Sequence, residues 1–214
     1  MLKNKKQLTT RCYNLEIRAD ENETGVIEGV PIVFDKETVI YDYCGQYREV
    51  IEKAALKNTD MKDVRLFVNH DTDKLTLARS KNGKGTMSFE VQEDGVHMRA
   101  TLDIENNTEA KNLYSAIKRG DMDGMSFMFR VDKDEWEDLD SDLPLRKIKS
   151  ISIIHEVSVV NFPAYNQTSV SARSSEETET SPLEEARKAQ SEETEKRKSA
   201  EIDLLKLKYK YLMS

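Results

Sequence analysis

Asp121-Met122-Asp123-Gly124-Met125-Ser126-Phe127-Met128-Phe129-Arg130 is the stretch from which the rest of the chain is best understood. As a β-strand it has two unlike faces, because successive side chains of a strand point to opposite sides of a sheet. One face is apolar and suited to a core, and it carries Met125, Phe127, Phe129 and Val131. The other face holds Ser126, and Gly124 beside it leaves room for another backbone or a substrate to approach the hydroxyl. The simpler interpretation is a small polar side chain that faces water.

The composition allows one domain of ordinary size with a polar appendage. The chain has 214 residues, 37% of them hydrophobic and 34% charged, and its net charge is -7. An acidic chain is poorly suited to a nucleic-acid groove, where clustered Lys and Arg must meet the phosphates. No apolar run is long enough to span a bilayer. We therefore expect a cytosolic protein with a protein or peptide partner, without nucleic acid or membrane. Cys12 and Cys44 are expected to be free thiols that form no metal pattern.

The chain before the central stretch is mostly extended. Alternation and β-branched content predict strands at 13–19, 24–34 and 64–70, a hairpin of 87–92 with 96–102, a less regular extended run at 38–51 and a short helix at 52–57. A helix is predicted from Thr108 to Gly120. His70 falls at the end of its strand, next to the turn-like Asp71-Thr72-Asp73.

After the central stretch we expect an acidic loop at 132–144, which contains Trp136, and then a strand over 148–160. Strict alternation divides this strand into one face with Ile151, Ile153, His155, Val157 and Val159 and another with Ser152, Ile154, Glu156, Ser158 and Val160.

The two ends of the chain differ from its middle. Residues 1–12 are expected to be a flexible terminus, 13–170 the folded domain and 171–181 a linker rich in Ser, Thr and Glu. Residues 182–214 are expected to form a charged helical tail, because Ser181 is suited to cap it, Pro182 to begin it and Glu184 to complete a capping box. The tail is either a solvated helix or a docking segment.

A serine, a histidine and an acid on separate strands are the parts of a nucleophile, a base and an orienting group, although spacing alone does not select them. His97 is expected to be solvated. His70 could be a turn residue or a base, and His155 could be a core histidine. A metal-dependent hydrolase with His70, Asp71 and Asp73 together with His155 or Glu156 is a weaker alternative, because neighbouring strand residues point to opposite faces. We predict no cofactor and no metal.

Several short segments, in order, resemble the prohead maturation proteases of tailed bacteriophages, a family related in fold to the herpesvirus capsid-assembly proteases. These segments are Gly29-Val30-Pro31-Ile32-Val33-Phe34, Tyr47-Arg48-Glu49-Val50-Ile51 with Ala54-Ala55-Leu56, Leu66-Phe67-Val68-Asn69-His70-Asp71, Asp123-Gly124-Met125-Ser126-Phe127, and His155-Glu156-Val157-Ser158-Val159-Val160 with Pro163-Ala164-Tyr165. The resemblance covers roughly 13–170. Three positions depart from the family pattern: Met128 stands where the family often has Gly, Ala54-Ala55-Leu56 where it often has Gly-Ala-Phe, and Ala78 where a glycine is expected. Met128 could narrow the groove beside Ser126.

The resemblance implies a serine endopeptidase in which Ser126 is the nucleophile and His70 the general base. Glu156 is implied as the orienting acid, with His155 as the alternative, since the herpesvirus relatives use a second histidine. Backbone amides of 161–167 are candidates for the oxyanion hole. The implied fold is mainly β with a few α-helices, a compact antiparallel barrel of the herpesvirus type plus the charged tail.

The same resemblance implies where the enzyme works and on what. Its substrates would be the scaffold protein, or the scaffold-like segment of the major capsid protein, and the chain itself. It would act inside the assembling prohead in the host cytoplasm, and related viral proteases that act as dimers suggest a homodimer. A non-catalytic scaffolding protein of the same fold is the alternative.

Overall fold

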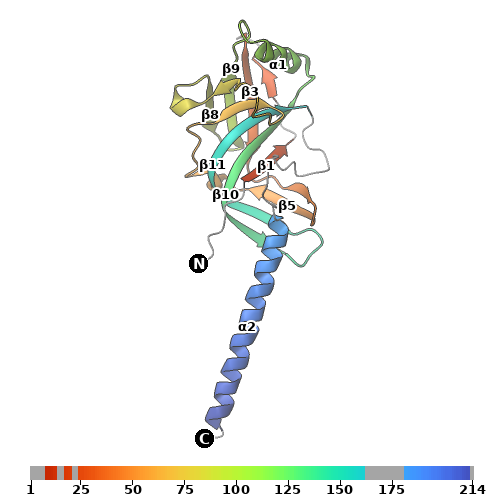
Figure 1. Cartoon of the computed structure of the whole chain (residues 1–214), viewed down its shortest axis with the longest axis vertical. Helices are drawn as coiled ribbons and strands as arrows, with labels where there is room; N and C mark the ends of the chain where they lie inside the picture. The colour runs from red at the N-terminus through yellow and green to blue at the C-terminus, as the bar shows by residue number, and fades with distance from the viewer. Residues whose placement is uncertain (1–7, 14–16, 21–23, 162–180, 213–214) are drawn as a thin grey trace.

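The computed structural model describes residues 8–13, 17–20, 24–161 and 181–212, and shows a mainly β domain with a long helix projecting from it (Figure 1). The larger sheet has the strand order β1 (Leu8–Tyr13), β10 (Gly124–Glu137), β11 (Leu145–Val160), β5 (Gly45–Ile51), β4 (Thr38–Asp42), with β6 (Arg65–Val68) also paired to β11 and β7 (Ala78–Arg79) paired to β6. The smaller sheet has the order β2 (Ile17–Ala19), β3 (Val26–Val33), β9 (Gly95–Thr101), β8 (Met87–Val91). The described pairings leave two open sheets and do not close them into a barrel.

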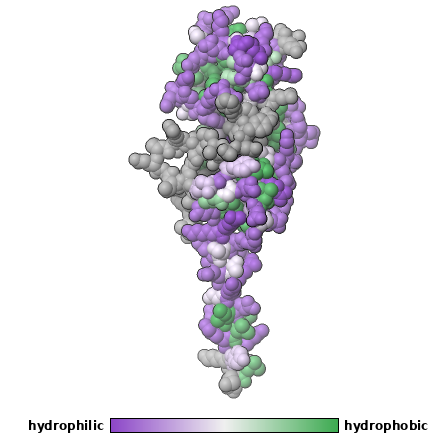
Figure 2. Space-filling view, turned by 90° about the vertical axis from the view of Figure 1, so that its right-hand side faces the viewer, coloured by the Kyte–Doolittle hydropathy of each residue, from purple (hydrophilic) through white to green (hydrophobic). Residues whose placement is uncertain are grey.

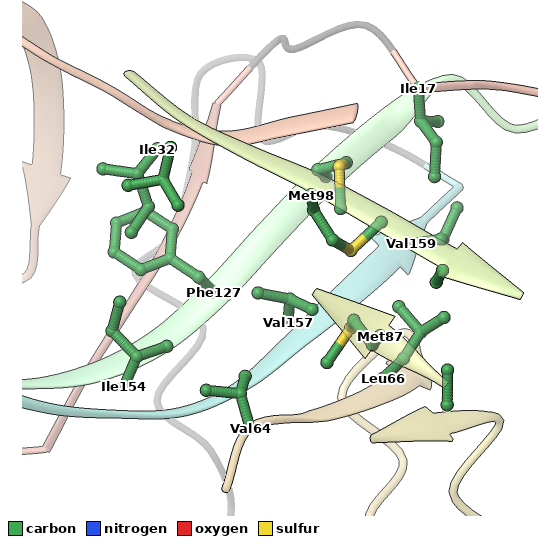
Figure 3. Packing of buried hydrophobic residues seen from close by; sticks show 14 of the residues in the cluster. Ile17, Ile32, Val64, Leu66, Met87, Met98, Phe127, Ile154, Val157 and Val159 are labelled. Atoms are coloured by element: carbon green, nitrogen blue, oxygen red, sulfur yellow. The ribbon is translucent and has the colours of Figure 1, made fainter. Parts of the chain in front are cut away.

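The core lies between the two sheets, as the residue pattern predicts. Phe127 of β10 and Val157 of β11 meet Ile32 and Met98 of the smaller sheet (Figure 3). Phe127 and Phe129 stack with ring centroids 4.7 Å apart. The apolar face of the central strand is therefore buried, which fixes the register of β10 and turns Ser126 to the opposite face.

The helix before β10 forms as expected. Asn107 caps α1 (Thr108–Arg119) with its side-chain oxygen, which accepts from the amides of Glu109 and Ala110. Gly120 ends the helix in the left-handed conformation at φ 75°, which glycine adopts without steric cost. The buried face of α1 comprises Ala110, Leu113, Tyr114 and Ile117. The short helical piece expected at 52–57 is a 3₁₀ turn, η1 (Lys53–Leu56), and a second such turn is η2 (Lys81–Gly83).

The acidic loop expected at 132–144 is shorter than predicted: β10 continues to Glu137, and only 138–144 connect it to β11. The acidic side chains of this part of β10 face basic ones on β11: Asp134 pairs with Arg146 at 2.7 Å and Glu137 with Lys147 at 2.6 Å. Opposite charges across a strand pair stabilise a polar ribbon that has little to bury.

The alternation predicted for 148–160 fails at His155. Phe129 pairs with Ile154 and Met128 with Glu156, so His155 is an extra residue without a partner on β10. Such a bulge shifts the alternation by one residue, so side chains beyond it point to the opposite face from the one that strict alternation predicts. The pairing also passes over Ser152, between the pairs Arg130–Ile153 and Val131–Ile151. Contrary to the expectation, Ile154 is therefore in the core and Ile153 is not, while Val157 is. Glu156 lies on the face of Ser126, because Ser158, two residues further on, pairs with Ser126.

Residues 1–12 are expected from the sequence to be flexible, but residues 8–12 belong to a strand, while 1–7 lie outside the described part of the chain. Leu8–Tyr13 forms β1, which pairs antiparallel with β10 in a register that sets Cys12 opposite Ser126. The edge of β10 needs a partner for its backbone groups, and β1 provides one. The strand predicted at 13–19 is represented by the end of β1 and by β2, and the residues between them lie outside the described part of the chain.

The tail begins as the capping signal predicts. The Ser181 hydroxyl accepts from the amides of Leu183 and Glu184, and α2 (Pro182–Leu212) follows. Buried Leu183 and a 2.5 Å hydrogen bond from Ser181 to Asp42 fasten its first turn to the β4–β5 hairpin. Beyond that turn the helix is mostly hydrophilic, with apolar side chains toward its far end (Figure 2). No helix in the described residues is both long and apolar enough to cross a membrane. The linker predicted at 171–181 lies outside the described residues except for Ser181.

Candidate active site

His70 stands on a turn that the end of β6 creates. Asn69 and His70 both have left-handed backbones, with φ of 52° and 59°. This conformation is unfavourable for residues other than glycine, although Asn tolerates it better than most. Three hydrogen bonds hold the turn against β11: Asn69 N to Val159 O at 2.9 Å, Asn161 N to Asn69 Oδ1 at 3.1 Å and His70 N to Ser158 Oγ at 3.1 Å. The turn carries the imidazole away from the apolar face to which strict alternation would assign it.

The imidazole of His70 joins a serine and a carboxylate. Its Nε2 lies 2.5 Å from Ser126 Oγ, and its Nδ1 contacts Glu156 Oε1. The other carboxylate oxygen of Glu156 accepts from Ser158 Oγ at 2.7 Å. The sheet register makes this arrangement possible, because Ser126 pairs with Ser158 and β6 runs parallel to the same part of β11.

The site is almost entirely removed from water. Ser126 and Ser158 are 0% exposed, Glu156 is 3% exposed and the His70 side chain is 12% exposed. A buried carboxylate is costly unless it is paired, and Glu156 has both His70 and Ser158 as partners. Because an ionised carboxylate only accepts hydrogen bonds, Nδ1 of His70 carries the proton. Nε2 then has its lone pair free to accept the Ser126 proton.

His155 is not part of this arrangement. It is the bulged residue, and its Nε2 is buried without a hydrogen-bond partner among the described residues. Burial, and then the charge of Arg130, lower the pKa of His155 below its usual value. The structure therefore brings Glu156 rather than His155 to His70. The third histidine, His97, is one-third exposed and bonds Asp94 at 2.9 Å on the hairpin, in keeping with the expectation that it is solvated.

Comparisons with known proteins show the family of the chain. The model of a family described as caudovirus prohead serine protease matches residues 13–181. The chain belongs to this family. It is also similar to a protein named prohead protease from Enterobacteria phage HK97, with 29% identity over 159 residues. The match covers 72% of this chain and 63% of that relative, so the chain spans less than two thirds of the relative's length. No solved structure matches the chain.

The backbone amides of 161–167, expected to form the oxyanion hole of this prohead protease family member, are not placed at the site by the described part of the chain. The amide of Asn161 is engaged by Asn69 Oδ1, and 162–167 lie outside the described part of the chain. The metal-hydrolase alternative also lacks support. Within the described ranges, no group of three or more His, Cys, Asp or Glu side chains is arranged to hold a metal ion.

One neighbour of Ser126 was not anticipated from the sequence. Ser126 Oγ also donates to the backbone oxygen of Arg11 at 3.0 Å, from the strand that pairs with β10. Arg11 itself is buried and bonds Glu49 of β5, 38 residues away. No local pattern predicts a contact at such a separation. Leu8–Tyr13 contains two threonines and a tyrosine, which favour a strand, but it has no regular alternation that would mark one face as buried.

Proposed function

We propose that this chain is a serine endopeptidase of viral prohead maturation, with Ser126 as nucleophile, His70 as general base and Glu156 as orienting acid. The observation that carries the proposal is the continuous contact from Ser126 Oγ through both ring nitrogens of His70 to Glu156. Membership of the prohead protease family supports the same activity.

The proposed reaction proceeds through an acyl-enzyme. Nε2 of His70 accepts the Ser126 proton as Oγ attacks the carbonyl carbon of the cleaved bond. Collapse of the tetrahedral intermediate breaks the C–N bond, and His70 gives the proton to the departing amine. Water then attacks the ester, with His70 again accepting and returning a proton. Glu156 holds the ring in the required tautomer and stabilises the imidazolium without taking its proton.

Ser158 is proposed as a positioning residue. Its hydroxyl donates to Glu156 Oε2 and accepts from the backbone amide of His70, so one side chain sets both the acid and the base. Support of this kind keeps catalytic groups within the narrow range of geometries in which they are effective.

The proposed substrates are the scaffold protein, or the scaffold-like segment of the major capsid protein, and the chain itself, inside the assembling prohead in the host cell. The division into a domain at 13–170, a linker and a charged tail also remains a proposal. The tail is a candidate for self-removal by cleavage between about 165 and 185, or for recruiting the enzyme into the shell. A homodimer is proposed because related viral proteases act as dimers. A barrel of the herpesvirus capsid-protease type remains a prediction, because the described strands form two open sheets packed across one core.

The test is co-expression with the major capsid and scaffold proteins, comparing the unmodified chain with Ser126→Ala. Removal of a serine nucleophile costs on the order of a million-fold in rate, so processing should stop in the variant. Cleavage at the same bonds in both would assign the cutting to a host protease and refute the proposal.

A non-catalytic assembly protein of the same fold is the alternative, and the long exposed helix α2 is the feature that favours it. Loss of shell assembly on truncation before Pro182, with Ser126→Ala leaving all processing intact, would support that alternative.

A further inference from the structure

The strand β1 lies against the proposed nucleophile as a bound peptide would. It is extended and antiparallel to β10, with Cys12 opposite Ser126 and Arg11 opposite Phe127. Ser126 Oγ is 3.0 Å from the carbonyl oxygen of Arg11, which belongs to the peptide group that joins Arg11 to Cys12. Addition of an extended strand to a sheet edge is a general way in which proteins bind peptides. The family match begins at residue 13, so most of β1 lies before the shared region.

The side chain of Arg11 occupies a pocket built for a guanidinium. Its Nε is 2.5 Å from Glu49 Oε1 and its Nη2 is 2.8 Å from Glu49 Oε2, a two-bond pairing of guanidinium and carboxylate. The hydroxyl of Tyr47 is 3.0 Å from the same Nη2. Arg11 is 6% exposed, Tyr47 is 1% exposed and Glu49 is fully buried, so the pocket lies in the interior.

Among the described side chains, the charges around the pocket balance when a cation is present. Glu49 also accepts from Arg146 at 3.1 Å, but Arg146 is paired in addition with Asp134 at 2.7 Å. With Arg11 removed, this network has two carboxylates and one guanidinium. Burial alone would raise the pKa of Glu49, yet the two arginines together lower it, so the carboxylate is ionised. Without Arg11, Glu49 would share the single charge of Arg146 with Asp134, and a buried carboxylate without a full counter-charge is costly. The vacated pocket should therefore select a positive side chain.

We propose that β1 occupies the acyl side of the substrate groove, and that the pocket of Glu49 and Tyr47 selects Arg or Lys as the residue before the cleaved bond. This proposal rests on Ser126 being the nucleophile. The substrate is a peptide segment that pairs with β10 in place of β1, with its basic side chain where Arg11 now lies and its carbonyl beside Ser126 Oγ.

The present state is a resting one. The Ser126 hydroxyl has one proton, and the acceptors within its reach include Nε2 of His70 and the oxygen of Arg11. While it donates to Arg11, it does not donate to the base. The contact is also to the carbonyl oxygen, whereas attack requires approach to the carbon. Departure of β1 frees both the hydroxyl and the pocket.

Peptide binding to full-length variants tests the pocket without using catalysis. The probes are acetyl-Leu-Thr-Thr-Arg-amide, which repeats the sequence of residues 8–11, and the same peptide ending in Leu, measured by calorimetry. Arg11→Ala empties the pocket, and Arg18→Ala is the matched control because Arg18 is an exposed strand arginine whose side chain is 78% exposed. We expect Arg11→Ala to bind the Arg peptide about tenfold or more tightly than the Leu peptide, because paired charged hydrogen bonds are strong. Arg18→Ala, in which β1 still fills the pocket, should bind the Arg peptide at least tenfold more weakly than Arg11→Ala. Equal affinity of Arg11→Ala for the two peptides would overturn the proposal.

Covalent labelling of the unmodified full-length chain provides a second readout, which also decides the question if Arg11→Ala does not fold. Two peptidyl phosphonates, identical except for a guanidinium or an isobutyl side chain next to the phosphorus, react with an activated serine and are followed by intact mass. Faster labelling by the basic phosphonate, with none in Ser126→Ala, supports the pocket, whereas equal or faster labelling by the apolar one overturns it. If the Arg peptide binds preferentially but neither phosphonate labels the chain, the pocket's preference for a basic side chain is supported and the assignment of Ser126 as nucleophile is not.

Discussion

Glu156→Gln tests the proposed triad with the smallest change of shape. The carboxylate accepts two hydrogen bonds, one from Nδ1 of His70 and one from Ser158 Oγ. A glutamine amide has an oxygen that accepts on one side and an NH₂ group that donates on the other, so it can still accept from only one of these two donors. The Ser158 hydroxyl already accepts from the backbone amide of His70. Its own proton keeps an acceptor only if the side-chain oxygen of the new glutamine faces Ser158. The NH₂ group then faces His70, Nδ1 must accept, and the ring proton moves to Nε2, where it blocks transfer from Ser126.

The wrong tautomer in a triad of this type costs about 10⁴-fold in kcat. Loss of the charge alone, with the tautomer preserved, costs less, since a hydrogen bond to a charged group contributes roughly 1.5–3 kcal/mol or about 10- to 100-fold. Because the orientation that satisfies Ser158 produces the wrong tautomer, we expect a fall of about 10³ to 10⁴-fold. The contact is made within the enzyme and not with substrate, so kcat should fall while KM changes little.

The assay is the single-turnover rate of capsid-protein cleavage, and two matched variants serve as controls. His155→Gln changes the adjacent residue of the same strand, and Glu137→Gln removes a carboxylate from an exposed cross-strand pair with Lys147. Both should keep activity within a few-fold. Full activity of Glu156→Gln, or a larger loss in His155→Gln, would refute Glu156 as the orienting acid.

Three further predictions concern the support of the site. Ser158→Ala should lower kcat by about 10- to 100-fold, because Glu156 loses a donor and the amide of His70 an acceptor, whereas Ser158→Thr should restore most of the rate measured with the same substrate. Asn69→Ala should destabilise the fold by about 1–2 kcal/mol in urea unfolding, since the variant loses the acceptor for Asn161 and places alanine at positive φ; a change below experimental error would contradict this account. The lowered pKa of His155 means that the folded protein stays unprotonated there while the unfolded chain binds a proton below pH 6.5. Stability should therefore fall as the pH drops below that value, and urea midpoints of His155→Gln should fall less than those of the unmodified chain; parallel profiles would show that His155 does not contribute.

The proposed roles of Ser126, His70 and Glu156 come from the resemblance to the prohead proteases, because spacing alone does not select a serine, a histidine and an acid. The residue patterns add where two of these side chains lie. The apolar alternation around Ser126 predicts which face it occupies, and the strand ending before His70 predicts that this residue can turn away from the core. Strict alternation already places His155 and Glu156 on opposite faces of the strand and favours Glu156. The sequence did not predict that His155 is bulged, because the bulge depends on how β11 is paired with β10 rather than on the residues of β11 themselves.

The parts of the fold that sequence reasoning missed are those determined by distant pairing. The segment after Arg130 looks like a loop because it has little to bury, and only the basic residues of β11 make it a strand. Residues 8–13 look like a flexible terminus for the same reason. Their order depends on the edge of β10 and on Glu49, which the chain reaches only after folding.

The most direct test of the central claim is to trap the acyl-enzyme. The full-length chain is mixed with unfolded capsid protein, quenched with acid during turnover, and analysed by intact mass and fragment mapping. We predict an ester of a capsid peptide on Ser126, present only while cleavage proceeds and absent from Ser126→Ala. Cleavage that continues without an adduct on Ser126, or with the adduct on another residue, would contradict the assignment of Ser126 as the nucleophile.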